Sequence, residues 1–151
     1  MRTDEEMMGM CLTLAREAAA RGDHPFGCVI VDGEGDIIST GRNQEMTRCD
    51  LTWHSEIEAL REAQKYAQSP DLSEYTLYTN GEPCLMCATV IRRAQIRRVV
   101  IGAPSKGSVH VNPHPLRDQV FSNTPAPELV EGVLLNDCLR VQGREAEICG
   151  E

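Results

Sequence analysis

The sequence has few aromatic residues and no long apolar run. Phe, Tyr and Trp make up only 4% of its 151 residues. No segment approaches the roughly 18 consecutive apolar residues that a membrane-spanning helix needs. The acidic start, residues 1–6, does not resemble a signal peptide. We therefore expect a cytoplasmic protein that does not enter a membrane. A hydrophobic content of 41% is typical of one globular domain, placed at residues 1–151.

Basic residues are outnumbered by acidic ones. The chain has 15 Lys and Arg against 23 Asp and Glu, and its net charge is −8. Binding to nucleic-acid phosphates requires clustered Lys and Arg. Basic residues gather at Arg92-Arg93 and Arg97-Arg98, which we interpret as a solvated helix end and the start of a strand. The composition argues against a nucleic-acid partner and favours a small, uncharged substrate.

The cysteines do not indicate a disulfide framework. There are seven, which is an odd number, and the expected compartment is reducing. Three lie within apolar patterns and are expected to be small core residues: Cys11, Cys28 and Cys138. Cys84 and Cys87 are the close pair, and their spacing is typical of a metal or redox site.

Hydrophobic periodicity predicts alternating helices and strands. A capping box at Thr3–Glu6 should open the first helix, which ends near Gly22. Further helices are expected at about residues 52–67, 84–93 and 133–141, and strands at 27–32, 37–41, 75–79, 98–102 and 128–131. Strand, helix and strand over residues 75–102 imply a right-handed crossover with parallel pairing. Residues 103–127 should form a long loop, and the Glu-rich C-terminal end should fray.

Three side chains have the chemistry of a catalytic zinc site. His54 offers an imidazole, and Cys84 and Cys87 offer two thiolates. A catalytic zinc keeps three protein ligands and leaves a position for water. The two cysteines lie at the start of a predicted helix, whose partial positive charge favours thiolates. Glu56, two residues after the histidine, is placed to move protons for that water.

Two alternatives remain for these residues. A redox-active Cys-x-x-Cys pair is one, although it would not need a neighbouring His-x-Glu. A closed structural zinc site is the other, with His24, His110 or His114 as the fourth ligand. Glu56 would be superfluous in such a closed site.

The catalytic alternative predicts a reaction. Zinc lowers the pKa of its bound water to about 7, which makes hydroxide available at neutral pH. Glu56 can accept the proton of that water and pass it to a ring nitrogen and then to departing ammonia. Attack falls on the ring carbon that bears the exocyclic amine. We predict one Zn2+ per chain and hydrolytic deamination of a heteroaromatic base.

The order His-x-Glu, then Pro-Cys-x-x-Cys, is the known signature of zinc-dependent nucleobase deaminases. Over about residues 5–140 the chain resembles the cytidine/deoxycytidylate deaminase-like superfamily, in particular its guanine deaminase, yeast-type cytosine deaminase and tRNA adenosine deaminase branch. The similarity rests on residues 25–31, 41–43, 50–60, 77–79 and 82–87. It implies a homodimer and an α/β fold: a three-layer α/β/α sandwich with a five-stranded mixed sheet and the zinc helices on one face.

The resemblance also assigns residues to the substrate pocket. Asn43 matches an asparagine that hydrogen-bonds the base, and the backbone N–H of Ser55 matches one that contacts the base. Relatives often have alanine at the second position. Phe26 matches a residue that lines the pocket, although a core role fits equally well. Further candidates lie beside the ligand or in the long loop: Trp53, His110 and His114. Trp53 has packing behind the helix start as its alternative role.

The resemblance leaves the substrate open. Residues 131–138 look like the tRNA branch, but residues 140–151 are acidic where those enzymes usually end in a basic helix. We therefore expect a free base or nucleoside of the guanine or cytosine type. A tRNA-specific adenosine deaminase, which converts adenosine to inosine at the wobble position, is the alternative enzyme. A non-catalytic zinc-stabilised binding module is the alternative of another class.

Overall fold

The computed structural model describes residues 1–105, 114–118 and 125–149. Its elements, in chain order, are α1 (Asp4–Ala20), β1 (Gly27–Val31), β2 (Ile37–Arg42), α2 (Ser55–Ala67), β3 (Thr76–Gly81), α3 (Leu85–Arg93), β4 (Arg98–Ala103), β5 (Glu128–Glu131), α4 (Leu135–Val141) and the 3-10 helix η2 (Glu145–Glu147). Within these residues, no helix combines the length and the apolar character that crossing a membrane requires.

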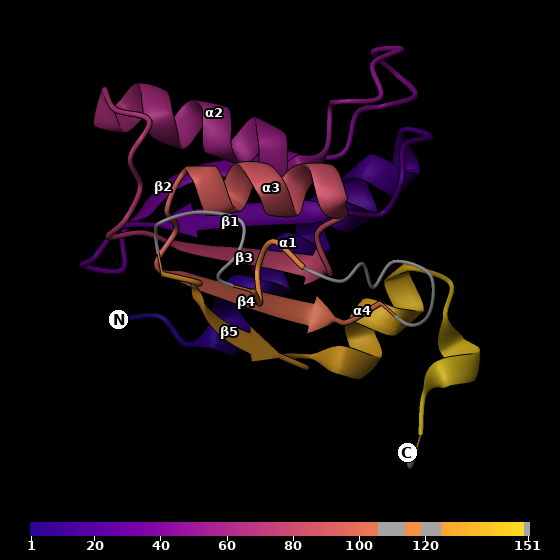
Figure 1. Cartoon of the computed structure of the whole chain (residues 1–151). Helices are drawn as coiled ribbons and strands as arrows, with labels where there is room; N and C mark the ends of the chain where they lie inside the picture. Colours follow the sequence, from indigo (N-terminus) through magenta and orange to yellow (C-terminus); the bar gives the residue numbers. More distant parts are fainter. Residues whose placement is uncertain (106–113, 119–124, 150–151) are drawn as a thin grey trace.

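The five strands form one mixed sheet in the order β2-β1-β3-β4-β5 (Figure 1). Strand β1 pairs antiparallel with β2 and β3, whereas β4 pairs parallel with β3 and β5. The predicted five-stranded mixed sheet is confirmed, and so is the parallel crossover from β3 through α3 to β4. Every residue of β1 and β3 is buried, as expected for central strands that are covered on both faces.

Helices cover both faces of the sheet, which confirms the three-layer sandwich. Helices α2 and α3 lie together on one face, and α1 and α4 lie on the other (Figure 1). Each face has its own apolar cluster. The three cysteines that were predicted to lie in the core have no exposed surface: Cys11, Cys28 and Cys138. All seven cysteines are free thiols.

Helix α1 begins as its sequence predicts. The Thr3 hydroxyl accepts a hydrogen bond from the Glu6 backbone N–H at 3.1 Å, and the Glu6 carboxylate accepts one from the Thr3 backbone N–H at 2.7 Å. This reciprocal capping box satisfies two N–H groups that have no partner within the helix. The helix then buries Met7, Met8 and Cys11 against the sheet.

Two arginines from the basic pairs are held by protein groups. Arg92 in α3 is buried and donates a hydrogen bond to the Pro115 carbonyl at 3.2 Å. Arg98 in β4 donates two hydrogen bonds to the Asp4 carboxylate at 2.9 and 2.8 Å. The prediction of a solvated helix end was wrong at Arg92, because a carbonyl oxygen from a distant segment replaces water there. The predicted start of a strand at Arg98 is confirmed.

Asp4 connects the first turn of α1 to the sheet. Besides the two bonds from Arg98, its carboxylate accepts one from the Tyr78 hydroxyl at 3.0 Å. The hydrogen bonds from Arg98 hold the pKa of Asp4 below its ordinary value of 3.8. The carboxylate therefore stabilises the folded chain in its charged form.

Replacing Asp4 by asparagine is expected to lower the free energy of unfolding at pH 7 by about 1 kcal/mol, because the charged hydrogen bonds are lost at a site partly open to solvent. The Asp4 pKa is lower in the folded than in the unfolded chain. Its contribution is thus complete above the unfolded value of 3.8 and disappears as pH falls through the folded value. Urea unfolding measured across this pH range should show the free energies of unfolding of the unaltered chain and of Asp4→Asn converging in acid. The exposed Asp36→Asn is the control; an equal loss in it would contradict the assignment.

Helix α2 begins later than its periodicity predicts, at Ser55 rather than near residue 52. The Asp50 carboxylate accepts hydrogen bonds from the backbone N–H and the hydroxyl of Thr52 at 2.8 and 2.7 Å. These bonds close a turn that competes with helix formation. His54 then caps α2 with extended backbone angles, which aims its ring out of the helix.

The C-terminal segment was expected to fray, and that prediction was wrong for its described residues. It forms η2, and the Arg144 guanidinium donates to the Pro104 carbonyl at 2.9 Å and to the Glu147 carboxylate. Gln142 donates to the Asn80 carbonyl at 2.9 Å. Ile148 packs against the apolar cluster under α1 and α4. An arginine and one apolar side chain thus attach an otherwise acidic tail to the sheet.

Candidate metal centre and active site

The predicted site residues converge at one edge of the sheet. Because β1 runs antiparallel to β2, the start of β1 lies beside the end of β2, and Gly27 pairs with Arg42. Phe26 immediately precedes β1, and Asn43 immediately follows β2. Residues 82–84 follow β3 at the same edge. Segments far apart in the sequence therefore meet where strand ends commonly form ligand sites.

Two glycines allow the close packing that shapes this edge. A side-chain carbon at Gly41 would lie 2.2 Å from the Ser55 backbone oxygen. One at Gly81 would lie 2.7 Å from the Phe26 ring. Only glycine accepts such approaches. Helix α2 therefore rests directly on β2, and Phe26 rests directly on the end of β3.

Three metal-ligand atoms face one point at the starts of α2 and α3. His54 and Cys84 are the N-cap residues, and Cys87 lies in the first turn of α3. The His54 Nδ1 atom lies 3.6 Å from the Cys84 sulfur and 3.4 Å from the Cys87 sulfur. A tetrahedral zinc with bonds of about 2.0 Å to nitrogen and about 2.3 Å to sulfur separates the nitrogen from each sulfur by about 3.5 Å. The three side chains therefore fit a zinc ion.

No fourth protein ligand joins this group within the described part of the chain, where it is the one cluster of its kind. His24 lies beside Glu45. The Nδ1 atom of His114 accepts the backbone N–H of Leu116 at 3.2 Å. His110 lies outside the described residues. The described geometry thus has the three-ligand arrangement of a catalytic zinc rather than a closed structural site.

The two sulfurs and the His54 imidazole shift one another's pKa values. The hydrogen bond from Cys87 lowers the pKa of Cys84 to about 4, with a further contribution from His54. The same hydrogen bond, together with burial, raises the pKa of Cys87. The hydrogen bond with Cys84 raises the pKa of His54. The thiolate, which is the form that binds a metal, is thus favoured at Cys84.

Glu56 is buried next to the metal ligands, with 5% of its surface exposed. One carboxylate oxygen, Oε1, accepts the Ser55 hydroxyl at 2.6 Å and the Thr79 hydroxyl at 3.0 Å. The carboxylate also contributes to the raised pKa of Cys87, so it lies close to the sulfurs. Both hydroxyls therefore hold the same carboxylate oxygen in place. The Ser55 hydroxyl thus orients Glu56.

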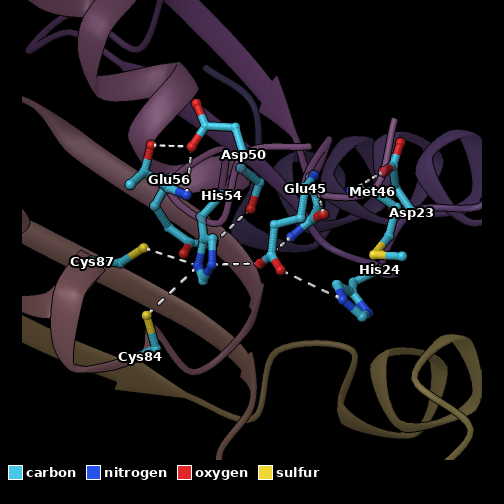
Figure 2. A network of polar contacts seen from close by, with 12 residues as sticks. Asp23, His24, Glu45, Met46, Asp50, His54, Glu56, Cys84 and Cys87 are labelled. Atoms are coloured by element: carbon cyan, nitrogen blue, oxygen red, sulfur yellow. Dashed lines mark hydrogen bonds and ion pairs between the residues drawn. The ribbon is translucent and has the colours of Figure 1, made fainter. Parts of the chain in front are cut away.

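Glu45 is a site residue that sequence reasoning missed. Its Oε1 atom lies 2.5 Å from the His54 Nε2 atom and accepts the Asn43 side-chain amide at 3.2 Å. Its Oε2 atom lies 3.6 Å from the His24 Nε2 atom. Figure 2 shows His54 between the two sulfurs on one side and Glu45 on the other. Zinc-binding histidines commonly donate their second N–H to a carboxylate, which was a usable signal. Several acids near His54 satisfied it equally well in the sequence.

A cavity of about 110 Å³ opens beside the metal ligands. Its lining includes two ligands, the candidate proton carrier and three predicted substrate residues: His54, Cys84, Glu56, Phe26, Asn43 and Ser55. Glu45 and Glu82 add two more carboxylates to the wall. Lys and Arg are absent from the lining that the structure describes. The site is therefore small and acidic.

Two predicted substrate residues lie away from this cavity. The Trp53 indole N–H donates to Glu58, and the Arg48 guanidinium stacks 4.1 Å from the ring centre. Adjacent residues of extended backbone point to opposite sides, so Trp53 faces away when His54 faces the cavity. It packs behind the start of α2, which was its alternative role. His114 is buried and is not part of the described cavity lining.

A sequence profile described as "Cytidine and deoxycytidylate deaminase zinc-binding region" matches residues 1–103. The chain belongs to this deaminase family. The matched range includes all three candidate metal ligands and Glu56, and it ends at the last residue of β4. The zinc that the spacing predicted is the metal of this family, and the deaminase has the ligand geometry to hold it.

Relatives of this deaminase carry different substrate names. It is 39% identical over 137 residues to the tRNA-specific adenosine deaminase of Haemophilus influenzae, covering 89% of this chain and 78% of the relative. A solved structure from studies of A-to-I editing by tRNA:A34 deaminases has a TM-score of 0.81 and 30% identity, covering 90% and 98% of the two chains. The Bacillus subtilis guanine deaminase structure has a TM-score of 0.65 and 38% identity, covering 68% and 66%.

Proposed function

We propose that this deaminase releases ammonia by hydrolysis from an amino-substituted nucleobase, presented as a free base or nucleoside of the guanine or cytosine type. The observation that carries the proposal is the shared cavity. Glu56, two of the metal ligands and the amide of Asn43 all line one hollow of about 110 Å³. A proton carrier, a metal position and a polar anchor for a planar ring therefore face the same small volume.

The residues support a balanced hydrolytic sequence. When bound, zinc acts as a Lewis acid that makes a water nucleophilic near neutral pH. Glu56 takes a proton from that water as its oxygen bonds to the ring carbon carrying the amine. Glu56 then returns the proton to the adjacent ring nitrogen. Glu56 then moves the proton of the newly added hydroxyl to the amine, the carbon–nitrogen bond breaks, and ammonia leaves as the carbonyl forms. No redox partner is required.

The character of the cavity supports a small substrate. Its described lining has three carboxylates, Glu45, Glu56 and Glu82, without Lys or Arg. The net charge of the chain is −8. A phosphate near these carboxylates would be repelled, and a polyanion would find little compensation on the rest of the protein. A free base or a nucleoside avoids both costs.

Adenosine in tRNA is the second candidate, and a specific observation favours it. The relative from Haemophilus influenzae that is named a tRNA-specific adenosine deaminase aligns with 89% of this chain at 39% identity. The similarity thus extends beyond the metal ligands to most of the domain. Under this alternative, the same cavity would receive one adenine of the folded RNA.

An ammonia-release screen separates the two candidates. Zinc-loaded protein is assayed with free bases, nucleosides, pterins, triazines and a tRNA anticodon stem-loop that has adenosine at the wobble position. We expect turnover of at least one small substrate, with a kcat/KM that changes little between about 50 and 200 mM salt. Deamination of the stem-loop alone, with activity that falls steeply over the same salt range, would overturn the small-substrate proposal.

A further inference from the structure

Glu45 has a direct contact with a metal ligand. The distance from its Oε1 atom to the His54 Nε2 atom is 2.5 Å. A carboxylate accepts hydrogen bonds, so the imidazole proton resides on Nε2. The Nδ1 atom faces the two sulfurs, 3.6 and 3.4 Å away, and its lone pair is the one that a metal between them would use. By accepting a hydrogen bond from Nε2, Glu45 selects the tautomer and the ring orientation that metal binding through Nδ1 requires.

The same oxygen also contacts the candidate substrate amide. Asn43 donates one side-chain N–H to Glu45 Oε1 at 3.2 Å, and its Oδ1 atom accepts the backbone N–H of Glu45 at 3.0 Å. These two bonds fix which end of the amide is nitrogen. A primary amide has a second N–H, and Asn43 lines the cavity with only 2% of its surface exposed. The remaining N–H is the group it can offer to a base.

The position of Glu45 is itself supported from the loop between α1 and β1. The Asp23 carboxylate accepts the backbone N–H groups of Met46 and Thr47, each at 2.9 Å, and the Thr47 hydroxyl at 2.9 Å. Asp23 is buried. Figure 2 shows Asp23 beside Met46, next to Glu45. These hydrogen bonds fix the backbone of the two residues that follow Glu45, which restricts where its carboxylate can lie.

We propose that Glu45 is a positioning residue that sets the metal ligand and the substrate amide together. One carboxylate oxygen holds His54 as an Nδ1 ligand and turns an Asn43 N–H into the cavity. The second half of this assignment rests on the proposed function, and the first half does not. A single side chain thereby makes zinc retention and base binding depend on each other.

The test combines a zinc competition titration with steady-state kinetics on Glu45→Ala and Glu45→Gln. Loss of such a partner typically weakens metal binding by about 10- to 100-fold. We expect that loss in Glu45→Ala and a smaller one in Glu45→Gln, whose amide oxygen still accepts a hydrogen bond. At saturating zinc, Glu45→Ala should raise KM more than it lowers kcat, because Asn43 loses its orientation. Glu62→Gln, an equal charge change on the exposed side of α2, is the matched control and should bind zinc like the unaltered chain.

Each outcome decides a separate point. Unaltered zinc affinity in Glu45→Ala would overturn the ligand-positioning role, and a loss shared by Glu62→Gln would do the same. An unchanged KM with a low kcat would overturn the Asn43 role. Circular dichroism of both variants shows whether they fold. The zinc titration needs no substrate. If the protein releases no ammonia from any compound in the screen, the proposed function is contradicted. The zinc titration still tests whether Glu45 positions His54.

Discussion

Replacing Glu56 by glutamine is expected to lower kcat for ammonia release by about 100- to 10,000-fold, the usual contribution of a positioned proton carrier. Glutamine has nearly the same shape, and its amide oxygen can keep the hydrogen bonds from Ser55 and Thr79 that are 2.6 and 3.0 Å long with glutamate. What it cannot do is accept a proton at neutral pH. The loss should therefore appear in kcat.

The measurement pairs turnover with metal content. Ammonia release is followed on the best substrate of the screen, and zinc per chain is counted by elemental analysis. Glu56→Gln should retain its zinc, since the three ligand side chains are untouched. Glu62→Gln again controls for the charge change. Full turnover by Glu56→Gln would show that catalysis does not require this carboxylate. Absence of turnover from every substrate by the unaltered chain as well would favour a zinc-stabilised binding module.

Cys87→Ala is expected to abolish both zinc binding and ammonia release. Cys87 is fully buried at the first turn of α3, and its sulfur lies 3.4 Å from the His54 Nδ1 atom. Without this thiolate only His54 and Cys84 remain, too few to hold a catalytic zinc. The expected change is from one zinc per chain to almost none, with turnover below detection.

Reversible removal of the metal complements the substitution. A strong chelator should inactivate the unaltered chain, and one equivalent of zinc should restore turnover. Cys149→Ala, which removes an exposed thiol, should behave like the unaltered chain in both measurements. If Cys87→Ala bound zinc at full stoichiometry and remained active, the metal would have to be held elsewhere. Turnover that survives complete removal of zinc would exclude the metal from the reaction.

The parts of the fold that were predictable depend on short-range patterns. The capping box at Thr3 and Glu6 involves residues three apart, and the buried strands are continuous apolar runs. The metal ligands were recognisable for the same reason. The His-x-Glu and Pro-Cys-x-x-Cys segments each occupy the start of a helix, and their chemistry can be inferred without knowing the packing.

The parts that were missed depend on partners distant in sequence. Arg98 donates a hydrogen bond to Asp4, 94 positions away in the sequence, and the buried Arg92 donates one to the Pro115 carbonyl, 23 positions away. Periodicity contains no information about either contact. Glu45 became recognisable only when the loop after β2 was placed against the start of α2. The late start of α2 has a local cause. The turn that Asp50 forms with Thr52 is favoured over an additional helical turn.

The metal ligands come from two segments that are separate in the sequence. His54 follows the β1–β2 hairpin, whereas Cys84 and Cys87 belong to the β3–α3–β4 crossover. A bound ion cross-links these segments over a separation of 30 residues. An ion that only the folded chain holds adds its binding free energy to the stability of the fold. Zinc would thus stabilise the fold as well as serve the reaction. A cell short of zinc would have less of this protein folded, as well as less of it active.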